Sequence, residues 1–193
     1  YLHRRQRQMC IRDRIQTGGS GFSNSPTIGI DAPPQLAFVA SSTTVDTTAN
    51  TISITNHPFE TGDQLTYDTT TLDTSAVAIG GLSAGTYYAI RVDDDLIKVA
   101  SSASNANNGT ALTLSSTGSG SQFFQGEQAV AGAVTVTAGE ITAIAISNKG
   151  GGYNTAPSVT ITDTTGTTAV VNTLFGRGIT SVTITTAGSY ASG

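Results

Sequence analysis

Residues 141–161 read ITAIAISNKGGGYNTAPSVTI, and the chain spells this stretch again, whole or in part, on both sides. A shift of 38 residues matches ITAIAISNKG (141–150) to ITSVTITTAG (179–188). A shift of 131 residues toward the N-terminus matches GGGYNTAP (150–157) to GSGFSNSP (19–26). Because the two spacings differ, a block of another kind separates the first copy from the second. Repeats of this kind are typical of modular, extended proteins, so we expect a piece of a longer fibrous or multidomain chain.

The sequence inside the repeat predicts two short strands joined by a tight turn. Ile144 and Ile146 follow the two-residue period of one sheet face, and a second strand is expected over residues 158–162. Gly150 to Gly152 permit positive φ in the turn between them. We expect the ring of Tyr153 to pack over this glycine surface. A phosphate-binding loop is the other interpretation of the glycines, but neither a helix start nor a GK[ST] motif follows them.

Residues 1–14, YLHRRQRQMCIRDR, differ in composition from everything that follows. They hold five of the nine Lys and Arg residues, together with the single Cys and the single Met. A basic arm for nucleic acid is one interpretation. We interpret the segment instead as an artefact, because RRQRQMCIRDR resembles the translation of a transposon-type sequencing adapter, and we exclude it from fold and function. The natural N-terminus is therefore expected to lie outside this sequence.

Without residues 1–14 the chain is clearly acidic. Acidic residues fall from 13 to 12 and basic residues from 9 to 4, so the formal net charge moves from −4 to −8. This charge argues against nucleic acid as a partner. The remaining sequence has no cysteine, which excludes disulfides, thiolate nucleophiles and cysteine metal sites. Its apolar runs are shorter than the roughly 20 residues that span a bilayer, so we expect no membrane insertion.

The sequence predicts an all-β fold: a small antiparallel β-sandwich or barrel-like module flanked by short glycine-rich β repeats. The two prolines of Ala32-Pro33-Pro34-Gln35 stiffen the backbone and mark the first boundary. We divide the chain into the adapter-derived residues 1–14, a partial glycine-rich repeat with a proline linker over 15–34, a central β module over 35–125, and tandem glycine-rich β repeats, truncated at the C-terminus, over 126–193.

The central module shows strand and turn signals along most of its length. Residues 86–92 and 96–100 read as two strands of a hairpin joined by Asp93-Asp94-Asp95. Residues 102–107 predict a single helical turn that Asn108-Gly109 ends. Further strands are expected at residues 51–55, 64–67 and 111–114.

Residues 45–124 resemble a module of tailed-phage virion proteins, particularly those of marine myovirus-like phages, and of some very large bacterial surface proteins. The resemblance rests on NHPFETGDQLTY (56–67), AIGGLSAGTYYAIRVDDDLIKVASSASNANNGTALTL (78–114) and STGSGSQFF (116–124). The flanking glycine segments look like the glycine-tyrosine-proline repeats that accompany such modules in tail, baseplate or fibre-like components. The resemblance implies an all-β structural role in the particle. The third copy departs from the pattern, because Gly188-Ser189-Tyr190 is one glycine short.

Asp93, Asp94 and Asp95 form the densest acidic cluster and are a weak candidate for a Ca²⁺ site, since hard cations prefer several carboxylate oxygens. Successive strand residues point to opposite faces, however, and the run lacks the alternating D-x-D-x-D-G spacing of a loop ligand set. A solvated hairpin turn is the favoured interpretation, and no metal or other cofactor is predicted.

Catalytic residues are not predicted. His57 is the one histidine outside residues 1–14, and it lies in a turn with no nucleophile elbow elsewhere, so we expect its ring to pack on Phe59 or a neighbouring strand. A glycosidase needs two facing carboxylates, and a single sequence does not show that any two acids converge. Asp63, Asp68 and Asp73 are the examples considered.

The tyrosines provide the candidate contact surface, which comprises Tyr87, Tyr88 and Tyr153. Tyr87 and Tyr88 fall on opposite faces of their strand, so one is expected in the core and the other exposed to a sugar or a protein partner.

These patterns favour a non-enzymatic structural component of a phage virion, associated with the tail, baseplate or fibre. Its expected partners are other virion proteins and further copies of itself, with a host surface glycan as an open second partner. The alternative is a bacterial cell-surface or extracellular adhesin fragment that binds carbohydrate or protein. A third hypothesis is a tailspike-like depolymerase whose catalytic domain lies outside this sequence.

Overall fold

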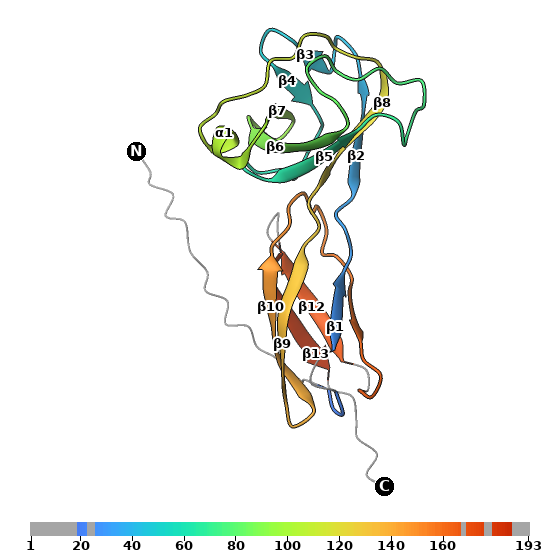
Figure 1. The fold of residues 1–193 in the computed structure, drawn as a ribbon, viewed down its shortest axis with the longest axis vertical. Helices are drawn as coiled ribbons and strands as arrows, with labels where there is room; N and C mark the ends of the chain where they lie inside the picture. The colour runs from blue at the N-terminus through green and yellow to red at the C-terminus, as the bar shows by residue number, and fades with distance from the viewer. Residues whose placement is uncertain (1–18, 23–25, 167–168, 176–178, 187–193) are drawn as a thin grey trace.

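The computed structural model describes residues 19–22, 26–166, 169–175 and 179–186 (Figure 1). A head of curled β-sheet lies at one end, and an elongated stalk of paired strands extends from it. The fold is all-β with antiparallel sheets, as the sequence predicted. The interpretation of residues 1–14 and of the third glycine unit, Gly188 to Tyr190, concerns residues outside those that the structure describes.

The head is a single antiparallel sheet of seven strands in the order β2-β8-β5-β6-β7-β4-β3. The sheet curls so that residues 35–39 of one edge strand lie across a groove from residues 53–55, at and after the end of β4. The head is therefore a barrel-like sheet with one open seam. Its strands are β2 (Gln35–Ala40), β3 (Val45–Asp46), β4 (Thr51–Ser53), β5 (Gln64–Asp68), β6 (Gly85–Arg91), β7 (Leu96–Ala100) and β8 (Gly120–Gly126).

The core of the head combines aliphatic side chains with a group of packed aromatic rings. Phe124 lies between Phe38, which stacks on it at a ring-centroid distance of 5.8 Å, and Tyr67, which tilts against it at 5.0 Å. Burial of such side chains removes apolar surface from water and is the main favourable term in folding. The other fully enclosed members are Ile52, Phe59, Leu65, Ile79, Ala89 and Ile97.

One buried polar network fixes the long connection between β5 and β6. The Tyr67 hydroxyl donates to Gln122 Oε1 and accepts from the backbone N–H of Ile79 at 3.1 Å. Gln122 Nε2 donates to the carbonyl oxygens of Val77 at 2.8 Å and Ser119 at 3.1 Å. Each of these buried groups thus has a partner, so the network costs little to bury and holds the connection against the sheet.

The predicted hairpin and helical turn are confirmed, whereas one predicted strand is wrong. β6 and β7 pair as expected, and α1 (Ala103–Asn107) begins where the Ser102 hydroxyl accepts from the Asn105 N–H at 3.1 Å. Residues 111–114 form no strand, because their N–H groups bond to scattered partners. Leu112 donates to Val99 O, and Leu114 donates to Asn50 Oδ1.

The stalk consists of three two-stranded antiparallel ribbons, and the apolar faces of the β1–β11 and β9–β10 ribbons pack together. Isolated ribbons are marginally stable, so their stability depends on packing their apolar faces together. Two clusters do this, around Tyr153 near the head and around Phe22 at the far end, and Ile144 belongs to both. The ribbons pair β1 (Thr27–Ile30) with β11 (Val159–Thr162), β9 (Val130–Thr137) with β10 (Glu140–Asn148), and β12 (Val170–Phe175) with β13 (Ile179–Thr186).

Irregular pairing in β10 places its isoleucines on one side. In a regular strand Ile141 and Ile144 would point to opposite faces, since they are three residues apart. The register of β10 against β9 shifts between Ile141 and Ala143. Such a β-bulge inserts one extra residue into the strand and changes the face to which a neighbouring side chain points. Ile141 is consequently fully buried beside Ile144 in the far cluster.

The glycine turns matched by the 131-residue shift share similar glycine φ values, and the strands that follow the two turns pair with each other. The first and third glycines of the two turns have closely matching φ values, +70° at Gly19 against +62° at Gly150, and +73° at Gly21 against +75° at Gly152. In the β1–β11 ribbon, Gly29 pairs with Thr160, its own counterpart under that shift. The ribbon therefore has a local two-fold axis at this pair.

The head is inserted into the stalk at one place in the chain, between β1 and β9. The spacing of 131 residues exceeds the tandem spacing of 38 by 93 residues, and the chain from Gln35 to Glu127 has this length. Gln35 pairs with Gln125 across the β2–β8 ladder, so the chain enters and leaves the head at adjacent points. An insertion with neighbouring ends can fold without distorting the unit that carries it.

We therefore expect residues 33–128 to fold as an independent domain. All members of the head core lie between Leu36 and Phe124, so removing the stalk leaves that core complete. Circular dichroism should show a β spectrum with a cooperative thermal transition, and a ¹⁵N–¹H spectrum should be well dispersed. A collapsed spectrum without a transition would show that the head depends on the stalk.

Candidate functional site

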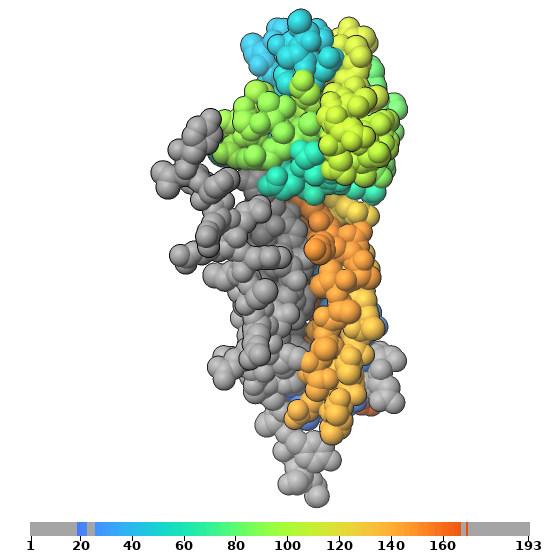
Figure 2. All heavy atoms as spheres, turned by 90° about the vertical axis from the view of Figure 1, so that its left-hand side faces the viewer, coloured from blue at the N-terminus to red at the C-terminus, as the bar shows by residue number. Residues whose placement is uncertain are grey.

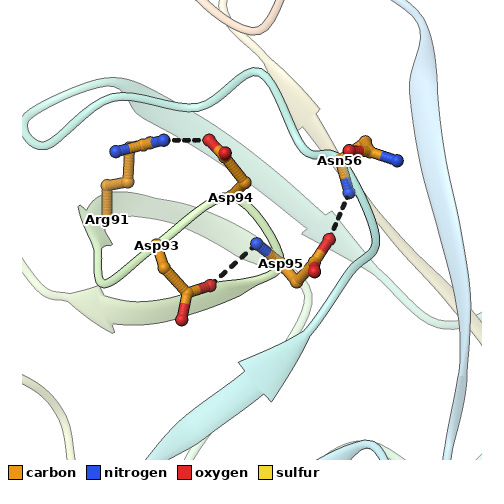
Figure 3. A network of polar contacts seen from close by, with 5 residues as sticks. All are labelled: Asn56, Arg91, Asp93, Asp94 and Asp95. Carbon is orange, nitrogen blue, oxygen red and sulfur yellow. Dashed lines mark hydrogen bonds and ion pairs between the residues drawn. The ribbon is translucent and has the colours of Figure 1, made fainter.

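The acidic triplet Asp93 to Asp95 forms the turn between β6 and β7, with its carboxylates engaged separately (Figure 3). Asp94 pairs with Arg91, Asp93 Oδ1 accepts from the Asp95 N–H at 2.8 Å, and Asp95 Oδ1 accepts from the Asn56 N–H at 2.8 Å. Figure 3 shows the three side chains pointing to different sides of the turn. The structure does not bring them together as the ligand set of the weak Ca²⁺ candidate. Among the described residues, no group of three or more His, Cys, Asp or Glu is placed to hold a metal ion.

His57 is a packing residue of the head. It is 2% exposed, and its ring stacks on Phe59 with centroids 5.7 Å apart, as the sequence predicted. Its backbone N–H donates to the carbonyl of Asp94, which joins this turn to the β6–β7 turn. A base for nucleophilic catalysis must reach the reacting group, and a ring enclosed in this way does not.

Tyr87 and Tyr88 do not divide into one core and one exposed side chain, because both are partly buried. The Tyr87 ring meets Tyr67 edge-on at 6.2 Å, and its hydroxyl bonds both to the N–H and to the C=O of Ser83. The Tyr88 hydroxyl donates to Gln64 Oε1 at 3.3 Å. Both tyrosines thus brace β6, and Tyr88 retains a partly accessible surface.

Tyr153 was expected on a contact surface, and this prediction is wrong because the side chain is only 2% exposed. Its hydroxyl donates to the Asp31 carbonyl at 2.8 Å and accepts from the Ala129 N–H at 3.0 Å. Asp31 lies on the chain that runs into the head, and Ala129 lies on the chain that leaves it. One buried side chain of the stalk therefore bonds to both of the chain segments that connect stalk and head. Its ring packs with Ile30 in the apolar cluster next to the head.

The glycine turn before Tyr153 packs directly against the head. A Cβ at Gly151 would lie 2.7 Å from Asp63 Cγ, and one at Gly152 would lie 2.8 Å from the Phe59 ring. The Gly151 N–H donates to Glu127 O at 3.0 Å, and the Glu127 N–H donates to Gln64 O at 3.0 Å. The backbone of the turn thus lies where a side chain on either glycine would clash with the head. A chain of hydrogen bonds also connects the turn, through Glu127, to Gln64 in β5.

Two glutamine side chains complete this junction. Gln125 Nε2 donates to the Pro33 carbonyl at 2.7 Å, and Gln128 Nε2 donates to the Ile30 carbonyl. Both carbonyls belong to the chain that enters the head, so this chain is held at the end of β1 and within the proline linker. The arrangement can hold the head in one orientation on the stalk, and it positions no acid, base or nucleophile at a cleft.

Sequence reasoning singled out the two halves of this junction without connecting them. NHPFETGD supplies Phe59 and Asp63, and GGGY supplies the turn and Tyr153, with roughly 90 residues between them. The signal that could have connected the two halves is the insertion of the central block before the second glycine turn, since an inserted block must pack against the turn next to it.

Comparisons with protein-family models, with curated proteins and with solved structures find no match to this chain. In the part of the chain that the structure describes, no helix is both long and apolar enough to cross a membrane.

We expect Gly152→Ala to destabilise the protein by about 2 kcal/mol or more. The backbone of residue 152 has φ +75°, which disfavours alanine, and the added Cβ would clash with the Phe59 ring. Gly132→Ala is the matched control, since its Cβ would make ordinary contacts of 3.4 and 3.5 Å. Chemical denaturation measures both changes. Equal stability of the two variants would show that the glycine turn does not hold the junction.

Burial raises the pKa of the Tyr67 and Tyr153 hydroxyls above the ordinary value of 10.0. Above about pH 10 the unfolded chain loses these protons and the folded chain keeps them, so stability falls as pH rises. Tyr153→Phe removes one such group. Its alkaline loss of stability should be shallower, by up to about 1.4 kcal/mol per pH unit.

The same variant should lose about 1 to 3 kcal/mol at neutral pH, because Ala129 N–H and Asp31 C=O lose a buried partner. Tyr88→Phe is the control, since that hydroxyl makes one long bond from a half-buried position. Denaturant titrations from pH 7 to about pH 11 measure both effects. Identical profiles for the two variants would contradict the assignment.

Proposed function

We propose that the protein is a non-enzymatic structural component of a phage virion, associated with the tail, baseplate or fibre. The observation that carries this proposal is the glycine junction, which joins a compact head to a stalk of paired strands through close backbone contacts and hydrogen bonds. An extended particle part needs this combination, because a module must be held at a fixed distance and direction from the particle.

The surface of the stalk supports the same proposal. In the β1–β11 ribbon, Ile28 and Ile161 face the interior while Thr27, Thr160 and Thr162 face outward. Such hydroxyl-bearing faces offer no charged patch for nucleic acid. We propose that the partners are other virion proteins and further copies of this chain, and that the location is the virion.

The adhesin fragment of a bacterial surface remains the second candidate, because a rigid stalk also presents a binding head away from a cell wall. The sequence resemblance includes very large surface proteins, which favours keeping it. A depolymerase with its catalytic domain elsewhere in the full protein is the third candidate, and release of reducing sugar by the full-length protein is its test.

Mass spectrometry of the source sample distinguishes the first two candidates. The sample is separated into virus-sized particles and cell envelopes, and both are searched for the tryptic peptides Val99–Lys149 and Gly150–Arg177. We expect both peptides to be enriched with the particles, alongside capsid and tail proteins. Enrichment with the envelopes would reject the virion proposal and favour the adhesin.

A further inference from the structure

A depression of about 470 Å³ lies where the β2–β3 connection, β4 and the start of β7 meet. This volume falls within the range of small-ligand sites, roughly 300 to 1,000 Å³. Figure 1 shows β3 and β4 at the end of the head opposite the stalk, and Figure 2 shows the chain around residues 40–50 forming that extremity. The depression is thus at the part of the head that points away from the stalk.

Hydroxyl groups dominate the lining of the depression. Four of them, on Ser42, Thr47, Thr51 and Ser53, make no hydrogen bond within the part of the chain that the structure describes. Each hydroxyl can donate one hydrogen bond and accept two. Thr51 and Ser53 alternate with the buried Ile52 along β4, so they present a fixed pair of outward hydroxyls. The surface is organised by the strand and offers donors and acceptors to a ligand.

The charge in the depression selects against anions. Asp46 lines it, and Asp46 Oδ1 accepts from the N–H groups of Thr48 at 2.7 Å and Ala49 at 2.9 Å, which fixes the carboxylate. Its Oδ2 atom has no hydrogen bond in the described chain and can accept from ligand hydroxyls, a charge-assisted interaction. One carboxylate is too few for a hard cation, which takes several oxygen ligands. The chemistry therefore fits a neutral molecule with many hydroxyls.

The open seam of the head extends this surface. Thr44 and Ser53 line both the depression and the seam, whose volume is about 400 Å³. Leu36 and Ile54 give the seam an apolar wall, suited to the C–H faces of sugar rings. Two adjoining hollows with hydroxyls in one and apolar side chains in the other match a chain of sugar rings better than a single ring.

We propose that the depression and the adjoining seam form a binding site for a neutral oligosaccharide. No aromatic side chain lines the depression, so ring stacking is absent there and we expect a single head to bind weakly, with a Kd of about 1 mM. Several heads on one particle or surface would raise the avidity by about 10² to 10⁴. The site depends on the head alone, so it holds whether the chain belongs to a virion or to a cell envelope.

The test is a ¹⁵N–¹H titration of the whole chain with neutral oligosaccharides of glucose, mannose and galactose, against oligogalacturonate as the anionic probe. We expect at least one neutral oligosaccharide to shift the signals of residues 42–53 with millimolar affinity, and oligogalacturonate to leave them unchanged. A flat response to every neutral oligosaccharide at about 20 mM overturns the proposal. Equal binding of the anionic probe also overturns it.

Three variants tie the binding to the site. Thr51→Val keeps a β-branched side chain and should weaken binding about fivefold, the effect of one lost hydrogen bond. Asp46→Asn keeps an acceptor for the turn and should weaken binding about tenfold through loss of the charge. Thr66→Val, on an exposed position of β5, is the matched control and should change nothing. Equal binding by Thr51→Val and Thr66→Val overturns the assignment.

Discussion

The hydroxyl of Tyr153 is the interaction on which the assembly of head and stalk depends. It lies between the chain that enters the head and the chain that leaves it, and it bonds to one backbone group of each. The bond to Ala129 is buried and the bond to Asp31 is partly buried, so losing the hydroxyl removes the partner of two backbone groups. The turn before Tyr153 can approach the head this closely because Gly151 and Gly152 have no Cβ. One aromatic residue and its glycines therefore determine how two modules are oriented.

The end of the stalk that lies away from the head contains the other copy of the same turn. Phe22 corresponds to Tyr153 under the 131-residue shift, and its ring fills the far cluster beside Ile141. Its backbone N–H donates to Gly139 O at 3.0 Å, at the turn of the β9–β10 hairpin. A phenylalanine has no hydroxyl, so Phe22 cannot bond to two chain segments as Tyr153 does. The turn thus packs on its neighbour in both places, and the tyrosine hydroxyl adds the connection to an inserted module.

Patterns within one segment predicted the fold well, and relations between distant segments were not predictable. The β6–β7 hairpin, the Ser102-capped turn and the stacking of His57 on Phe59 depend on nearby residues, so the sequence contains the information. The residues of 111–114 alternate like a strand, but their N–H groups bond to Asn50 and Val99, which no local pattern indicates. Tyr153 was assigned to the contact surface, whereas its hydroxyl bonds to Asp31 and Ala129, which precede it in the chain by 122 and 24 residues.

The acidic residues show why composition alone does not locate a site. Asp46 and Asp68 each accept from two backbone N–H groups just after them, and those N–H donors lower the pKa of both carboxyls. Asp73 does the same with the hydroxyl and then the N–H of Ser75, and its pKa is also lowered. Asp163 repeats the turn in the stalk. An aspartate followed by Thr or Ser thus builds a turn at each place, and its charge serves the local backbone. Asp46 differs from the others in that it lines a depression in which four hydroxyls make no hydrogen bond within the described chain. What distinguishes a binding residue from a turn residue in this chain is therefore the surface around it, which forms only when β3, β4 and β7 come together.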